Sequence, residues 1–279
     1  MKKIKNIIVP TDFSATSRNA YHYAQVLAEA LDAEITVVHV KDVLLPAAEL
    51  AIRTHFDEVN SLTEVMDEFV NSTDDDAPVM VKTKVKTKVL RGAVISELIA
   101  YSAKDEVDLI VMGTTGLQDF LSKIIGTVSL EVANKAHCPV MLVPRDAVFK
   151  PIDRIMFGAD YFSTSPKTVR EITDFAGLLS ANIHFVHVNE NKMDDDKLME
   201  TIWDELFEFN DPSVAFEMHT IYRGDVVDQL KKYAQHHKID LIAFVNKKRS
   251  FWRNLMHNSV TQNVSIATDK PMLILHFDD

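Results

Sequence analysis

The chain repeats itself, and this repeat decides how many folds the sequence has to explain. Residues 34–40 read EITVVHV and residues 182–188 read NIHFVHV, which are 148 positions apart. A second match joins RGAVISELIAYSAKDEVDLIVMG at 91–113 to RGDVVDQLKKYAQHHKIDLIAFV at 223–245, which are 132 positions apart. Two stretches that match in the same order indicate a tandem duplication of one domain.

The two separations also locate the domains. They differ by sixteen residues, so the first copy carries the longer insert, between His39 and Gly92. A chain of 279 residues is long enough for two domains of ordinary size. We predict an N-terminal domain over residues 1–146 and a C-terminal domain over residues 150–279.

Each copy alternates strand-like and helix-like segments. In the first copy, short apolar runs rich in β-branched residues predict strands at 6–10, 34–40, 81–89, 108–112 and 140–143. Apolar residues spaced by three and four predict helices at 14–31, 47–70, 94–103 and 128–136. This alternation is typical of βαβ units. The predicted fold class is α/β, with two Rossmann-like, doubly wound domains, each having a five-stranded parallel sheet of order 3-2-1-4-5.

The third predicted strand carries lysine at every second position. Residues 81–89 alternate valine or threonine with lysine, which puts four lysines on one face. Lysine commonly protects a sheet edge from unwanted pairing, so we predict an exposed edge strand and assign the lysines no binding role. With this strand at the edge, the strand order reverses between the first and fourth strands, where ligands bind in sheets of this type.

The glycines point to the same place. The chain has seven, about a third of what an average usage of roughly 7% would give. Gly113, Gly116 and Gly126 fall within fourteen residues that begin where the fourth predicted strand ends. Bare backbone lets amides approach a ligand, and the helix predicted after Gly126 would favour a phosphate at its start. Asp12, after the first strand, can accept hydrogen bonds from a ribose hydroxyl or an exocyclic amine. This combination predicts a nucleotide site.

These residues also carry a family resemblance. The chain opens with a strand that ends in Pro-Thr-Asp, and the loop after Met112 has the spacing G-x2-G-x9-G-T. In both features the chain resembles a tandem universal stress protein of the UspA-like family, with the adenine nucleotide alpha hydrolase-like fold. In that family the two motifs mark the members that bind ATP. The nucleotide-binding residues that the resemblance implies are Pro10, Thr11, Asp12, Val40, Met112, Gly113, Gly116, Gly126, Thr127, Val128 and Ser129.

The resemblance also implies which part of the nucleotide each residue would contact. Asp12 and the backbone of Val40 would contact the adenine or the ribose, and Met112 and Gly113 would line the ribose. Gly116, Gly126 and residues 127–129 would hold the phosphates. We expect ATP, ADP or AMP in the N-terminal domain, with Mg²⁺ left open, and a role in stress response or signalling through nucleotide-dependent partner contacts.

The second copy departs from this pattern. The positions of Gly113 and Gly116 hold Val245 and Lys248, although Asp160 remains where the first copy has Asp12. The capping pair Asn258-Ser259 replaces Gly126-Thr127, and the basic stretch Lys247-Lys248-Arg249 is interpreted as a solvated turn, with anion binding as the alternative. We therefore expect no nucleotide or other cofactor in the C-terminal domain.

Enzyme motifs are missing from the sequence. It contains no G-x4-G-K-[ST] loop, no G-x-S-x-G elbow and no H-E-x-x-H pair. We therefore predict a binding protein and not an enzyme. Slow ATP hydrolysis and self-phosphorylation at Thr127 or Ser129 stay open as one alternative, and a nucleotide-free scaffold stays open as another.

Candidate metal and thiol chemistry is weak. His39 and His187 recur at one place in apolar strands and are interpreted as structural. His236 and His237 have no acidic or cysteine partner at ligand spacing, so no metal site is predicted. Cys138, beside an apolar run, is expected to pack in the core.

Charge and composition narrow the partners. The net charge of −11 argues against general nucleic-acid binding, because such a surface repels a phosphate backbone. No apolar run reaches the about eighteen residues of a membrane span, and a single cysteine fits a reducing compartment, so we expect a cytoplasmic protein. By the family resemblance, the strands at 140–143 and 272–275 would pair within one chain as a pseudo-dimer, and a homodimer is left open.

Overall fold

The structure is a computed structural model that describes residues 3–42, 62–72, 83–114, 127–158, 166–189, 214–222, 226–246 and 270–276. The chain divides into two compact units. The N-terminal unit contains Ile4–Thr115 and Ile125–Phe149, and the C-terminal unit contains Lys150–Asp279. Among the described helices, none is long and apolar enough to cross a lipid bilayer.

The N-terminal unit is built on a parallel sheet. Its strands are β1 (Asn6–Pro10), β2 (Glu34–Lys41), β3 (Val85–Arg91), β4 (Leu109–Thr114) and β5 (Val140–Pro144). The pairs are all parallel and give the order β3-β2-β1-β4-β5, so the order reverses between β1 and β4. The predicted α/β, Rossmann-like fold is confirmed.

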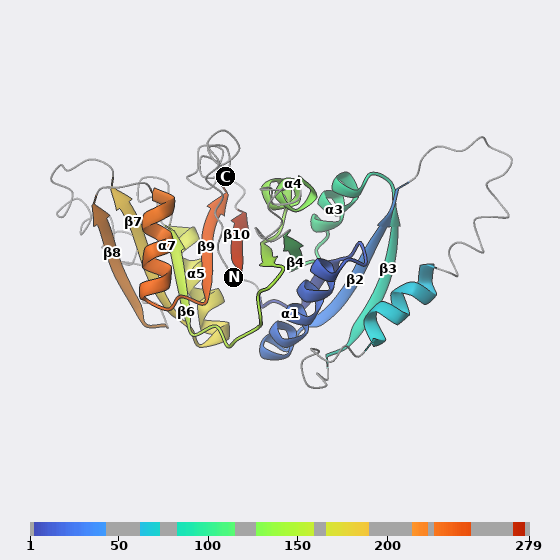
Figure 1. Cartoon of the computed structure of the whole chain (residues 1–279), viewed down its shortest axis with the longest axis horizontal. Helices are drawn as coiled ribbons and strands as arrows, with labels where there is room; N and C mark the ends of the chain where they lie inside the picture. The colour runs from blue at the N-terminus through green and yellow to red at the C-terminus, as the bar shows by residue number, and fades with distance from the viewer. Residues whose placement is uncertain are drawn as a thin grey trace, which may run out of the picture. The chain divides into compact units, whose positions relative to one another are not determined.

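Helices cover both faces of this sheet. They are α1 (Ala15–Leu31), α3 (Val94–Ser102) and α4 (Thr127–Lys135). Residues 62–71 form a further helical segment, and the rest of the helix predicted over 47–70 lies outside the described residues. Helix α1 packs on β1, β2, β4 and β5, whereas α3 and α4 pack together on the other face (Figure 1). The Ser14 hydroxyl accepts a hydrogen bond from the Ser17 N–H at 3.2 Å, a standard cap that starts α1.

The lysine-rich strand lies at the sheet edge, as predicted. The described strand β3 begins at Val85 and extends to Arg91, two residues beyond the predicted end. Lys84 and Lys86 each approach the Glu34 carboxylate at 2.7 Å. These ion pairs are exposed, so their contribution to stability is small.

The C-terminal unit repeats the design. Its strands are β6 (Arg154–Gly158), β7 (Asn182–Asn189), β8 (Phe216–Tyr222), β9 (Leu241–Asn246) and β10 (Met272–His276). They are parallel in the order β8-β7-β6-β9-β10, which is the order of the first sheet. Helices α5 (Pro166–Leu179) and α7 (Val226–His236) lie on the two faces of this sheet (Figure 1).

The duplication extends to single hydrogen bonds. One carboxylate oxygen of Asp108 accepts from the backbone N–H groups of Lys5 and Asn6, at 2.9 and 3.0 Å. Asp240, 132 positions later, accepts from two N–H groups at the start of β6, at 3.1 and 3.0 Å. In each unit an aspartate before the fourth strand therefore anchors the start of the first strand.

Candidate functional site

The structure brings the ends of β1 and β4 together at the point where strand order reverses. Ile7 pairs with Leu109 and Ile8 pairs with Ile110, so Pro10 at the end of β1 lies beside the last residues of β4. Ligand sites in doubly wound sheets form outside such strand ends. The predicted residues on these two strands therefore share one end of the sheet.

The loop after β1 is held by its own side chains. An Asp12 carboxylate oxygen accepts from the Ser14 N–H at 3.0 Å, and the Thr11 hydroxyl accepts from the Phe13 N–H at 3.0 Å. The Thr11 hydroxyl also lies 3.0 Å from the Ser17 hydroxyl in the first turn of α1. Thr11 is buried, whereas Asp12 is exposed at the strand end. The loop thus presents one carboxylate from a fixed backbone.

Asp12 is held in its charged form. Partial burial would raise the pKa of its carboxyl, but hydrogen bonds from Ser14 and Ser17 outweigh burial and hold the pKa below its usual range. At neutral pH the side chain is therefore a hydrogen-bond acceptor only.

Phe13, the residue after Asp12, stacks on a second ring in a way that the sequence does not predict. Phe13 has a left-handed backbone with φ of 65°, which costs a phenylalanine about 1–3 kcal/mol. Its ring stacks on His39 at 4.6 Å between centroids, and His39 Nδ1 lies 2.9 Å from the Thr11 carbonyl oxygen. His39 thus has the structural role that the sequence predicts. Nothing in the sequence pattern separates Phe13 from an ordinary loop residue.

Gly113 is required by packing. A β-carbon at this position would lie 2.6 Å from the Thr16 carbonyl oxygen and 2.7 Å from the Thr16 Cγ2. The first turn of α1 therefore approaches β4 too closely for any side chain. The sequence explained this glycine by a ligand, and the structure adds a reason that needs no ligand.

The first turn of α4 is tied to β4. The Ser129 hydroxyl donates to the Gly113 carbonyl oxygen at 2.8 Å, and Ser129 is buried. Thr127 begins the helix and is exposed, and Val128 is half-buried. The first N–H groups of a helix have no partner within it, so they can meet a phosphate.

The remaining predicted residues fall into two groups. Val40 is buried in β2, two residues beyond Val38, which pairs with Pro10, and Met112 is buried in β4. The predicted residues that lie outside the described part of the chain are Gly116, Gly126, Asp160, Lys247, Lys248, Arg249, Asn258 and Ser259.

Comparison with known proteins decides the family. A family model described as the universal stress protein family matches residues 3–144 and again residues 151–276. The chain belongs to the universal stress protein family. It carries two of its domains in tandem.

Individual relatives agree with this assignment. A universal stress protein of Methanocaldococcus jannaschii is 32% identical over 148 residues, which cover 50% of this chain and 82% of that protein. One of Thermus aquaticus is 30% identical over 142 residues, covering 50% of this chain and 98% of that protein. The crystal structure of a universal stress protein from Archaeoglobus fulgidus superimposes with a TM-score of 0.72, covering 99% of both chains at 20% identity. At that identity the last match speaks for the fold alone.

The second universal stress protein domain has different packing at the point where its strand order reverses. Phe157 pairs with Ala243, so the next residues in the register are Gly158 and Phe244. A β-carbon on Gly158 would lie 2.5 Å from the Phe244 ring, which is buried. The same positions in the first domain hold Pro10 and Met112. The Phe244 ring therefore packs against Gly158 in the second domain, at the positions where the first domain has Met112 and Pro10.

Proposed function

We propose that the N-terminal universal stress protein domain binds an adenine nucleotide, ATP in the first place, and that the chain acts in stress response or signalling through nucleotide-dependent contacts with partners. The observation that carries this proposal is the exposed, ionised Asp12 at the strand-order reversal, on the same sheet end as the start of α4. A nucleoside phosphate needs a hydrogen-bond acceptor for its ribose or base and N–H donors for its phosphates, and Asp12 and the first turn of α4 would supply them.

Asp12 serves the sugar or base end. The loop holds it through the Ser14 N–H, while its exposure keeps the carboxylate open to a ligand. A hydrogen bond to a charged group contributes about 1.5–3 kcal/mol. A ribose hydroxyl or an exocyclic amine supplies the donor that an ionised carboxylate requires.

The α4 start serves the phosphates through its backbone and the exposed Thr127 hydroxyl. The Ser129 hydroxyl is already bonded to the Gly113 carbonyl, so its part is to hold the helix against β4. This arrangement favours binding over transfer of a phosphate to Ser129. A phosphate at a helix start gains from the helix dipole, and an accompanying Mg²⁺ ion would reduce its charge.

A thermal-shift titration of the full chain tests the proposal. A ligand that binds only the folded state raises stability by about 2.7 kcal/mol when its concentration is 100 times Kd. We expect the melting temperature to rise with ATP, ADP or AMP concentration. No rise with any of the three at millimolar concentration would overturn the proposal.

Asp12→Asn gives the matched variant. The amide oxygen can still accept from the Ser14 N–H, so the loop keeps its turn while the carboxylate charge is lost. We expect ATP affinity to fall about tenfold to a hundredfold, the loss of a charged hydrogen bond. The exposed Asp146→Asn is the control and should bind ATP as the wild type does. Equal affinities for the wild type and Asp12→Asn would remove Asp12 from the site.

A further inference from the structure

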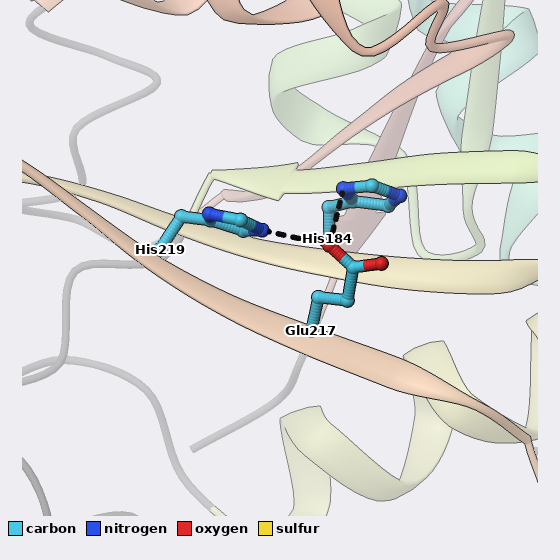
Figure 2. A group of neighbouring side chains, drawn as sticks. All are labelled: His184, Glu217 and His219. Atoms are coloured by element: carbon cyan, nitrogen blue, oxygen red, sulfur yellow. Dashed lines mark hydrogen bonds and ion pairs between the residues drawn. The ribbon is translucent and has the colours of Figure 1, made fainter.

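Three side chains with metal-ligating atoms converge on one face of the second sheet. His184 on β7 pairs in register with Glu217 on β8, and His219 lies two residues beyond Glu217. Alternate residues of a strand share a face, so the three side chains point the same way. Figure 2 shows both imidazole rings directed at the Glu217 carboxylate.

The distances are short enough for a shared ion. One Glu217 carboxylate oxygen lies 3.0 Å from His219 Nε2 and 3.8 Å from His184 Nδ1. One ligand atom from each residue lies within 4.8 Å of the others, and in the described part of the chain no other group of three His, Cys, Asp or Glu residues does this. Zinc ligands lie about 2.0–2.2 Å from the ion, which separates ligand atoms by roughly 3.2–3.6 Å.

The group of three side chains is buried on the side of His184 and exposed to solvent on the side of Glu217. His184 is only 5% exposed, and its Nδ1 lies 2.8 Å from the Tyr233 hydroxyl of α7. The His237 ring stacks on Tyr233 at 4.0 Å. Glu217 is exposed on β8, the edge strand of this sheet, so an ion could enter from solvent.

We propose that His184, Glu217 and His219 form a binding site for a divalent transition-metal ion of the Zn²⁺ class. Two imidazoles and one carboxylate are ligands that such ions prefer, and three protein ligands leave a position open for water or a small anion. Hard cations such as Mg²⁺ and Ca²⁺ prefer a set made of oxygen atoms, so they do not fit this group. The proposal is independent of nucleotide binding in the first domain.

The first domain provides an internal comparison. Thr36 pairs with Lys86 in the register where His184 pairs with Glu217, and Lys88 holds the position of His219. The Lys88 ammonium group donates to the Tyr101 hydroxyl at 3.2 Å. Threonine and two lysines cannot bind a metal cation, so the same fold carries the site in one copy only.

The alternative is a purely structural cluster. Without an ion, His219 hydrogen-bonds Glu217 and His184 hydrogen-bonds Tyr233, which satisfies these groups. A structural cluster predicts no specific Zn²⁺ affinity, and a metal site predicts one ion per chain. The two explanations therefore differ in a direct binding measurement.

The test is a titration of the EDTA-treated full chain with Zn²⁺ against a chromophoric zinc indicator. We expect one tightly bound ion per chain. Glu217→Gln and His219→Ala should each weaken binding at least about tenfold, since changes even outside the ligand set cost about that much. Both residues lie on the edge strand, and circular dichroism of each variant checks that the fold is kept. Wild-type affinity in both variants, or no Zn²⁺ bound by the wild type at micromolar concentration, would overturn the proposal.

Two controls and one further variant sharpen the result. Lys88→Ala changes the corresponding position of the first domain and His137→Ala removes an exposed histidine outside the group, so both should bind Zn²⁺ like the wild type. Tyr233→Phe removes the hydroxyl that occupies His184 Nδ1. It should bind Zn²⁺ as tightly as the wild type or more tightly, and a loss of tenfold or more would contradict the assignment of the three ligands.

Discussion

The carbonyl oxygen of Thr16 lies 2.6 Å from the place that a β-carbon on Gly113 would take. This close approach brings the first turn of α1 against the end of β4, at the point where the strand order reverses. The glycine that begins the candidate nucleotide loop is therefore needed for folding as well. A loss of ligand binding on substituting Gly113 would not by itself report on the ligand.

Gly113→Ala should destabilise the folded chain by about 1–3 kcal/mol, the usual cost of forcing an extra carbon into a packed site. Differential scanning calorimetry without nucleotide measures the change. Gly177→Ala is the control, because Gly177 is exposed in α5 and alanine there should stabilise by about 0.5–1 kcal/mol. An unchanged melting temperature for Gly113→Ala would show that α1 can shift away from β4.

Gly158→Ala should also destabilise, because its new β-carbon would meet the Phe244 ring at 2.5 Å. The first domain has Met112 at the position of Phe244. Adding Phe244→Met should therefore restore part of the lost stability, since methionine is flexible. A double-mutant cycle measures the coupling, which we expect at about 0.5–3 kcal/mol for residues in contact. Additive effects of the two substitutions would contradict the packing explanation.

Asp108→Ala and Asp240→Ala should have matching effects on the two units. Each substitution removes an acceptor of two backbone N–H groups, and we expect each to cost about 1–3 kcal/mol. Hydrogen exchange can be read strand by strand, and protection should fall in β1 for Asp108→Ala and in β6 for Asp240→Ala. Loss of protection in neither strand would mean that the paired aspartates do not anchor them.

Cys138 should be unreactive in the folded protein. Burial, followed by the negative charge of Asp108, raises the pKa of its thiol from 9.0 to about 12, and the thiolate is the reactive form. The folded chain therefore keeps a proton that the unfolded chain loses, so stability should fall as pH rises from about 9 towards 12. Cys138→Ala should lack this part of the fall. Rapid reaction of the native protein with a thiol reagent at pH 8 would contradict the burial.

Periodicity and composition were enough to predict most of the fold. In the described part of the first unit, apolar runs and their alternation predicted the strands and the helices α1, α3 and α4 to within a few residues, and the lysines identified β3 as an edge strand. Of the helix predicted over 47–70, the structure describes only the part from residue 62. That Asp12 and Gly113 lie at the same end of the sheet followed from the predicted strand order alone. These features depend on local pattern and on general rules of parallel sheets, both of which can be read from one chain.

Contacts between distant segments could not be predicted in this way. Thr16 and Gly113 are far apart in sequence, and no pattern marks threonine as the neighbour that requires a glycine. The sequence did not predict the group of His184, Glu217 and His219 for a related reason. If the 132-residue separation between the two copies held in the third strand of each, Lys86 would correspond to Met218. In the structure, the strand register makes Lys86 correspond to Glu217. A shift of one residue moves every side chain to the other face of the sheet, so the sequence alignment hides the group.

The measurement that tests the central claim most directly is the ATP stoichiometry of the full chain by isothermal titration calorimetry. The account predicts one ATP per chain, lost or strongly weakened in Asp12→Asn and unchanged in Asp160→Asn, its counterpart in the second copy. No heat of binding at millimolar ATP would contradict it. So would two equivalent sites, or a single site that Asp160→Asn abolishes and Asp12→Asn leaves intact.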